Sequence, residues 1–209
     1  HLGNITAEDH GIAGVNLDVD ACAQCHDSES GFQQGFYQWT GSQHVISAEA
    51  AGGHAGELSF CVKCHTGEGF VSVQVEKGPP NVVEHPNGIT CSACHDPHDS
   101  ENPHQIRLVG NATISSGDVL EDPGKGGLCA RCHESRVENA EDEALNSFRG
   151  AHHGPQADML VGKNAVGFGL EFVGNSAHTT IVEDSCVECH MAPPTEAGPG
   201  VTEPPRVGS

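Results

Sequence analysis

The sequence is poor in aromatic residues, which limits the apolar core that the polypeptide can build by itself. Aromatic residues make up only 4% of the chain, with seven Phe, one Tyr and one Trp in 209 residues. Charged residues, at 18%, fall below the usual quarter of a globular domain, whereas the 27 glycines are about twice the usual share. Taken as bare polypeptide, this composition is close to that of a loop-rich or partly disordered chain.

Basic residues are also scarce. Nine Lys and Arg stand against 29 Asp and Glu, for a net charge of −20. Nucleic acids and anionic membrane surfaces repel such a chain, so we expect neither as a partner. The charge favours basic proteins, metal cations or positively charged mineral surfaces, unless it serves solubility alone.

Long apolar runs are missing as well. The chain has no stretch of 18 or more apolar residues, so we expect no membrane span. It begins at His1 without an initiator Met or a charged-then-apolar leader, and we therefore expect an exported product whose signal peptide has been removed.

Cysteine, in contrast, is plentiful, and one short pattern uses all ten copies. Each pattern is a Cys pair separated by two residues and followed directly by His. Motifs 1 to 5 are CAQCH at 22–26, CVKCH at 61–65, CSACH at 91–95, CARCH at 129–133 and CVECH at 186–190. The pairs are Cys22 and Cys25, Cys61 and Cys64, Cys91 and Cys94, Cys129 and Cys132, and Cys186 and Cys189.

The following histidine separates the chemistries open to paired cysteines. Structural zinc sites, thioredoxin-like redox couples and disulfide frameworks use paired cysteines but do not explain it. With 15 His in the chain, five such histidines would arise by chance on the order of once in a million. CxxCH is the c-type haem attachment signature, in which two thiols bind one porphyrin and the adjacent imidazole binds iron. We expect five haem c groups, with His26, His65, His95, His133 and His190 as proximal ligands.

The spacing of the motifs predicts one shared fold. Successive first cysteines lie 39, 30, 38 and 57 residues apart, too close for five separate domains and too uneven for a solenoid. We expect a single multihaem cytochrome c domain over 1–209, mostly coil with a few short α-helices and little β, organised around a closely packed haem stack. Segment 1–21 precedes the first motif, and the Pro/Gly-rich segment 193–209 forms an extended tail.

Local patterns add three expectations. Each motif should lie on a short helical turn. Segment 131–148 has good helix formers with apolar residues on one face, which predicts a longer helix. Segment 69–78 alternates apolar and polar residues, which predicts a strand or hairpin arm.

The second axial ligands should be mostly histidine, because the chain has only two methionines, Met159 and Met191. Seven candidates for distal ligands follow from local context: His44, His54, His85, His98, His152, His153 and His178. His1, His10 and His104 rank lower. Seven candidates exceed five sites, so some should be structural, hydrogen-bonded to haem propionates, or ligands to a haem in another subunit.

Two placements are notable within this set. His98 lies three residues beyond His95 and faces away from the haem of that motif, so it suits a neighbouring haem. His152 and His153 are adjacent, so their side chains can diverge toward two different haems.

The five CxxCH motifs, CHDPH at 94–98 and HHGPQADML at 152–160 resemble multihaem c-type cytochromes of metal-reducing and other anaerobic microbes. Over residues 22–190 the chain looks most similar to the small extracellular cytochromes that polymerise into cytochrome nanowires. That resemblance implies bis-histidine, low-spin haems in a continuous stack. It also implies that a histidine of one subunit completes a haem in the next.

Three functions follow as expectations. The first is electron transfer in an extracellular or cell-surface homopolymer, with redox partner cytochromes or extracellular acceptors as partners. The second is a soluble periplasmic electron shuttle. The third is a multihaem reductase with one open haem, which is disfavoured because all five motifs keep their His and because the chain is short. We therefore expect an electron carrier rather than an enzyme.

Overall fold

The computed structural model describes residues 19–26, 33–82, 84–97, 101–136, 154–164, 168, 170 and 174–191. The chain divides into two compact units, the first running to Arg107 and the second starting at Leu108. The single domain expected over 1–209 stays a prediction. Segment 1–21 is described only from Val19, and the tail 193–209 lies outside the described residues.

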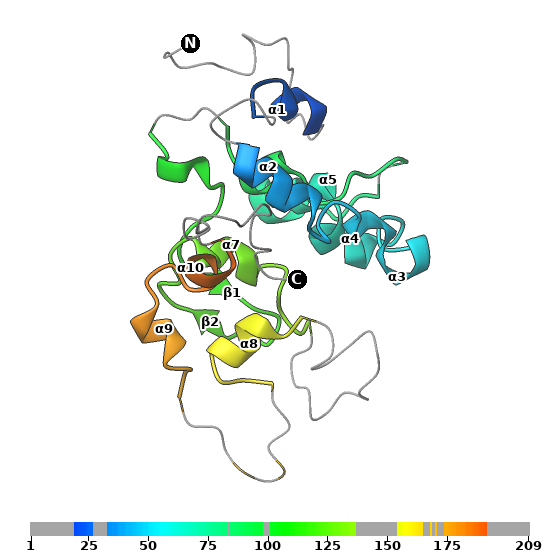
Figure 1. The fold of residues 1–209 in the computed structure, drawn as a ribbon. Coiled ribbons are helices and arrows are strands. Elements are labelled where there is room, and N and C mark those ends of the chain that lie inside the picture. The colour runs from blue at the N-terminus through cyan, green and yellow to red at the C-terminus, as the bar shows by residue number, and fades with distance from the viewer. Residues whose placement is uncertain are drawn as a thin grey trace. The chain divides into compact units, whose positions relative to one another are not determined.

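Short helices joined by irregular chain make up the first unit (Figure 1). In chain order they are α1 (Val19–His26), α2 (Gln33–Thr40), the 3₁₀ turn η2 (Ser47–Glu49), α3 (Ala50–Gly53), α4 (Ser59–His65), α5 (Gly67–Phe70), the π-helical turn η3 (Val71–Val75), α6 (Cys91–Cys94) and the 3₁₀ turn η4 (Pro103–Gln105).

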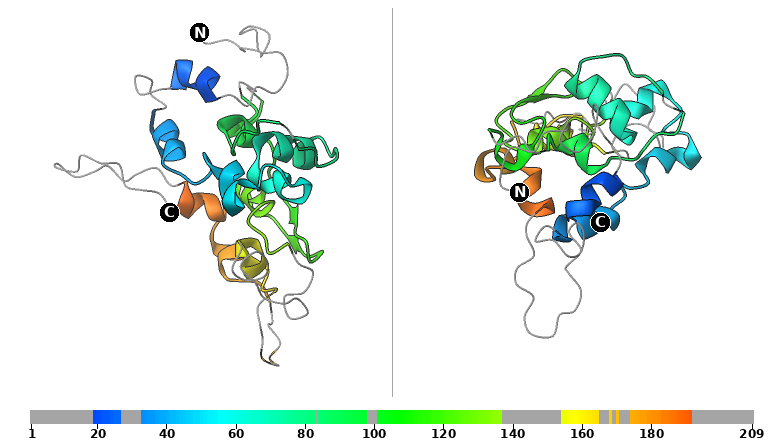
Figure 2. Two further views of the ribbon diagram at one scale, coloured as in Figure 1. Left: turned by 90° about the vertical axis from the view of Figure 1, so that its right-hand side faces the viewer. Right: turned by 90° about the horizontal axis from the view of Figure 1, so that it is seen from above.

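The core of the first unit lies where α4, α5 and η3 pack together, and Figures 1 and 2 show these turquoise helices side by side. Val62, Phe70 and Val71 are all buried there. Thr66 joins the two helices, because its hydroxyl donates to the Val62 carbonyl at 3.0 Å and accepts from the Gly69 amide at 3.0 Å. The Thr66 side chain therefore caps α5 while it is anchored to α4.

The strand predicted at 69–78 is wrong. That segment is the end of α5 followed by the π-helical turn η3, in which the Glu76 amide donates to the Val71 carbonyl at 2.9 Å. The Thr66 cap starts a helix at Gly67, and the helix satisfies its backbone groups locally, whereas a strand needs a neighbour. The alternation of valines with polar residues favours a strand, but the helix that begins at the Thr66 cap continues through them.

The second unit combines one small hairpin with four short helices among its described residues. These are β1 (Ala112–Thr113), β2 (Val119–Leu120), α7 (Gly126–Ala130), α8 (Gln156–Leu160), α9 (His178–Ile181) and α10 (Cys186–His190). The strands are antiparallel, with Ala112 opposite Leu120 and Thr113 opposite Val119. Behind the hairpin lies a cluster of mostly small buried residues: Ala112, Ile114, Leu120, Ala130, Ala157 and Val161.

The longer helix predicted from 131 is wrong in its first part. Helix α7 ends at Ala130, and 131–136 form turns and bends. The Ser135 amide donates to the Asp158 carboxylate at 2.7 Å, and Arg136 has a φ of 62°, so the backbone turns away from a helical path. The remainder, 137–148, lies outside the described residues.

The predicted architecture of mostly coil, short helices and little sheet is confirmed for the described residues. The longest helices there have eight residues, against a mean of about 11–12 in globular proteins. Within the same residues, none of the helices has the length and apolar character needed to cross a membrane. The closely packed haem stack stays a prediction.

Gly69 provides a test of the α4–α5 packing. A Cβ added there would lie 2.3 Å from the Val62 carbonyl oxygen and 2.7 Å from the Thr66 hydroxyl. Gly69→Ala is therefore expected to lower the free energy of unfolding by about 1–3 kcal/mol, measured by denaturant unfolding of the purified protein.

The matched control is Gly35→Ala in α2, where nothing lies within 4 Å of the added Cβ. This change should raise the free energy of unfolding by roughly 0.5–1 kcal/mol, because alanine favours helix over glycine. Equal effects of the two substitutions would contradict the packing described here.

Candidate functional site

The predicted helical turns at the motifs are confirmed. Motif 1 ends α1, motif 2 ends α4, motif 3 begins with α6 and motif 5 forms α10, while α7 ends within motif 4 at Ala130. In a helical turn, residues three apart lie on the same side. Each Cys pair and the histidine behind it therefore start from a compact local arrangement.

The motif 2 imidazole is held by a carbonyl from outside its motif. The Nδ1 atom of His65 lies 3.1 Å from the Ser47 carbonyl oxygen. A carbonyl oxygen only accepts hydrogen bonds, so Nδ1 carries the proton and Nε2 of the neutral ring keeps its lone pair. Ser47 also donates its hydroxyl to the His65 carbonyl at 2.8 Å and accepts from the Ile89 amide at 3.0 Å. Ser47 therefore links motif 2 to the segment that leads into motif 3.

The motif 3 imidazole is held in the same way. His95 Nδ1 lies 3.1 Å from the His104 carbonyl oxygen, which again assigns the proton of the neutral ring to Nδ1. His95 and Ile106 also form an antiparallel backbone bridge. The segment around η4 thus braces motif 3 from one side.

Arg107 completes this brace. Its amide donates to the Cys94 carbonyl at 2.9 Å, and its guanidinium Nε donates to the Ser92 carbonyl at 2.8 Å. The guanidinium also pairs with Asp96 at 3.3 Å. The side chain of Arg107 is only 10% exposed, so this one cation joins both ends of motif 3.

The motif 4 imidazole is held by α8. The Ala157 amide donates to the His133 carbonyl at 2.9 Å, and the side chain of Gln156 forms a hydrogen bond with the His133 ring. Surrounding protein atoms lower the pKa of His133 by desolvation, the Gln156 bond opposes this, and the charge of His190 lowers the pKa further. The environment thus favours the neutral imidazole that binds metals.

A buried polar network fixes α8 in this position. The Asp158 carboxylate accepts from the Ser135 amide at 2.7 Å, from the Ser135 hydroxyl at 2.6 Å and from the Asn164 side chain at 2.6 Å. Asp158 is 1% exposed, so its three donors satisfy a carboxylate that water does not reach. The chain that leaves motif 4 is thereby tied to α8.

The other two proximal candidates, His26 and His190, each lie at the C-terminal end of a helix. His26 is the last residue of α1 and is half-buried, and His190 is the last residue of α10 and is exposed.

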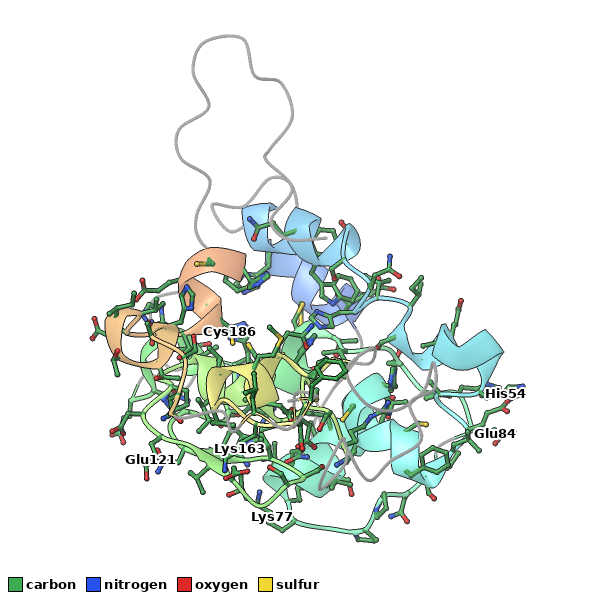
Figure 3. The ribbon with its side chains drawn as sticks, turned by 90° about the horizontal axis from the view of Figure 1, so that it is seen from below. His54, Lys77, Glu84, Glu121, Lys163 and Cys186 are labelled. Atoms are coloured by element: carbon green, nitrogen blue, oxygen red, sulfur yellow. The ribbon has the colours of Figure 1, made fainter. Side chains whose placement is uncertain are left out.

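The distal candidates divide into those that the structure describes and those that it does not. His44, His54, His85 and His178 are all exposed (Figure 3 shows His54 pointing outward from the ribbon). His54 pairs with Glu57 at 3.1 Å, and His178 contacts the Ser176 hydroxyl at 3.1 Å. His98, His152 and His153 lie outside the described residues. The assignment of distal ligands stays a prediction.

Three cysteine thiols have shifted pKa values in the chain before haem attachment; their Sγ atoms are those that become thioether sulfurs. The pKa of Cys91 is lowered to about 7, chiefly by a hydrogen bond from Cys22, and that of Cys186 is lowered to about 7 by one from Cys129. Burial opposes both shifts. Burial raises the pKa of Cys94 to about 11, although the Arg107 charge opposes it.

The donor set fits covalent haem. Each motif has two thiols on or beside a helical turn, and in motifs 2 and 3 a backbone carbonyl lies against Nδ1 of the imidazole, a contact that metal-binding histidines commonly make. Zinc sites need three or four such ligands together, and no group of three or more His, Cys, Asp or Glu side chains suited to a metal ion occurs among the residues that the structure describes.

Several positioning residues were missed from the sequence: Ser47, the His104 carbonyl, Arg107, Gln156 and Asp158. Gln156 and Asp158 belong to the segment HHGPQADML, which carried part of the family resemblance. The bonds to the two imidazoles come from the Ser47 and His104 backbone carbonyls, which every residue has, so the sequence gives no signal for them.

The shifted thiols predict a pH-dependent reactivity in the reduced, haem-free chain. A lowered pKa means more thiolate at a given pH, so Cys91 and Cys186 should react with iodoacetamide with midpoints near pH 7. Cys94, with its pKa near 11, should stay largely unmodified at pH 8. Peptide mass spectrometry after timed alkylation measures all three.

The control removes the hydrogen-bond donor. Cys22→Ala should move the Cys91 midpoint up toward the ordinary thiol value of about 8.5 and leave Cys186 unchanged, and Cys129→Ala should do the reverse. Equal alkylation rates for Cys91 and Cys94 in the unmutated chain would contradict the opposite pKa shifts described for these two thiols.

Comparison with known proteins points to the same chemistry. A family model described as a doubled CXXCH motif matches residues 85–138, which contain motifs 3 and 4. No curated protein and no solved structure matches the chain significantly. The match, together with three further copies of the motif outside it, indicates a multihaem c-type cytochrome with covalently bound haem c, and hence electron transfer.

Proposed function

We propose that the chain transfers electrons through five haem c groups and does so as the subunit of an extracellular filament. The observation that carries the electron-transfer part is the set of five CxxCH motifs, with the imidazoles of motifs 2 and 3 held at Nδ1 by carbonyls outside their motifs. Hydrogen bonds of this kind fix the tautomer and the ring orientation of a histidine that binds a metal.

Each part of the chain has a defined task in this proposal. When bound, haem supplies a reversible one-electron iron couple. The paired cysteines hold it covalently, and the five proximal histidines bind its iron. Carbonyls and Gln156 orient the imidazoles, while Arg107 and Asp158 hold the segments that carry them.

The filament part draws support from spare histidines at the surface. After five proximal ligands, ten histidines remain for five sixth positions. His54, His85 and His178 are exposed, so another copy of the chain has access to their side chains. An imidazole donated across an interface would complete a site in the neighbouring copy, as the resemblance to cytochrome nanowires implies.

The surface charge agrees with an exported carrier. A net charge of −20 keeps copies soluble before assembly and favours contact with basic redox partner cytochromes or with cationic extracellular acceptors. Export with the signal peptide removed, to the cell surface or beyond, is part of the same proposal.

The haem count is the first test. Protein produced with a c-type maturation system should have the mass of the polypeptide plus five haems, and its oxidised EPR spectrum should be low-spin throughout. A colourless product with the mass of the bare polypeptide would refute the proposal. A persistent high-spin ferric signal would favour a reductase with one open haem.

The filament is tested by imaging and by ligand variants. Negative-stain microscopy should show filaments, and one of His54→Ala, His85→Ala and His178→Ala should abolish them while converting one of five haems to high spin. His104→Asn is the matched control, because it removes an exposed imidazole, keeps the carbonyl that accepts from His95, and tolerates the positive φ of 62°.

Monodisperse particles from the unmutated protein would reject the filament and favour a soluble periplasmic shuttle. Filaments that survive all three histidine variants with low-spin haems would reject a cross-subunit ligand at these positions.

A further inference from the structure

Thiols from different motifs meet in pairs within each unit. In the first unit, Cys22 of motif 1 forms a hydrogen bond with Cys91 of motif 3. In the second unit, Cys129 of motif 4 forms one with Cys186 of motif 5. Both contacts join the first cysteine of one motif to the first cysteine of another. The same relation therefore arises twice, once in each unit.

The helices that carry these thiols are also in contact. Helix α1 packs against α6, and α7 packs against α10. Figure 1 shows α7 and α10 beside each other. Neither pair is the one that the doubled-motif family match contains, since that match covers motifs 3 and 4. Motif 3 lies in the first unit and motif 4 in the second, so the match takes one member from each spatial pair.

Close backbone contact holds motifs 4 and 5 together. A Cβ on Gly126, at the start of α7, would lie 2.9 Å from the Asp184 carbonyl oxygen and 3.1 Å from the Cys186 amide nitrogen. A Cβ on Gly124 would lie 2.4 Å from the Asp184 carboxylate. Only glycine permits this approach, and it brings the start of α7 directly against the residues that enter motif 5.

An ion pair reinforces the same contact. The Lys125 ammonium group pairs with the Asp184 carboxylate, which also accepts from the Lys125 amide at 3.0 Å. Both side chains are mostly buried, with 30% and 23% exposed, so water screens the pair only in part. The contact thus has a polar link beside its close backbone packing.

Helix contact, close backbone packing and a half-buried ion pair therefore all bring the start of motif 4 against the start of motif 5.

We propose that the haem sites are organised as two spatial pairs, motif 1 with motif 3 and motif 4 with motif 5, rather than as neighbours in sequence order. The adjacent first cysteines, Cys22 with Cys91 and Cys129 with Cys186, would then hold the two haems of each pair. Motif 2 is the remaining site, connected to motif 3 through Ser47. This inference rests on the proposed function, because it needs haem at each motif.

The test is a set of haem deletions in the full-length, haem-loaded protein, followed by circular dichroism in the Soret band. Neighbouring haems give an exciton couplet there, whose amplitude depends on their mutual contact. Motifs 3, 4 and 5 are removed by changing both cysteines to alanine, singly and in the pairs 3 with 4 and 4 with 5. Mass spectrometry confirms the haem count of each variant.

For each double deletion, the change in couplet amplitude is compared with the sum of the two single deletions. The effects of deleting motifs 4 and 5 on the couplet amplitude should be strongly non-additive, because either deletion alone removes the signal that the two haems share. This departure from additivity should be larger than the departure for motifs 3 and 4. An equal or larger interaction between motifs 3 and 4 would overturn the pairing while leaving five-haem electron transfer intact.

A milder comparison keeps the inference testable if deletion variants do not fold. Lys125→Ala breaks the ion pair that joins motifs 4 and 5, whereas Lys163→Ala breaks a pair with Asp118, at 3.5 Å, that involves neither motif (Figure 3 labels Lys163 and Cys186). With five haems retained in both, only Lys125→Ala should reduce the couplet. Equal couplets in the two variants would overturn the proposal.

Two further outcomes separate the possible failures. A product without haem defeats the proposed function itself. A Cys129–Cys186 disulfide in a non-reducing peptide map of the purified protein would show that this thiol contact serves cross-linking, and the pairing would be rejected.

Discussion

Hydrogen bonds between a proximal imidazole and a group far outside its own motif are the constraint on which the rest of the structure depends. Two cysteines and a histidine within five residues supply ligands but do not fix the direction of the ring. The Ser47 and His104 carbonyls provide that direction for motifs 2 and 3, and Gln156 contacts the ring of motif 4. Each such contact requires irregular chain at a defined place, which explains why so much of the described polypeptide is loop.

The small size of the protein core accompanies this large share of irregular chain. The apolar cluster of the second unit consists largely of alanines and a few aliphatic residues, and that of the first unit centres on three short helices. Buried polar groups such as Thr66, Ser135 and Asp158 take a large part in fixing these segments. A chain so short of aromatic residues gains its remaining apolar contacts from the porphyrins that it binds, which explains why composition alone suggests partial disorder.

Sequence patterns predicted the chemistry of the sites better than their supports. The motifs specify thiol and imidazole positions directly, and their helical turns follow from the local spacing. The braces were not predictable, because the imidazoles of motifs 2 and 3 are held by backbone carbonyls that any residue offers. The side-chain braces come from residues that lie outside the motifs in sequence. The strand expected at 69–78 failed because the Thr66 cap, a single side chain, decided the conformation of the valines behind it. The helix expected from 131 failed where Asp158, more than twenty residues later, captures the Ser135 amide.

The position of each brace along the chain sets the order in which the motifs can meet their braces during synthesis. Ser47 emerges before His65, so the motif 2 imidazole meets its carbonyl as soon as it appears. The His95 ring cannot form its hydrogen bond until His104 has been made, and the His133 ring cannot do so until Gln156, more than twenty residues later, has been made. The imidazoles of motifs 3 and 4 therefore gain their hydrogen-bond partners only after later parts of the chain have been made, whereas that of motif 2 has its partner from the start.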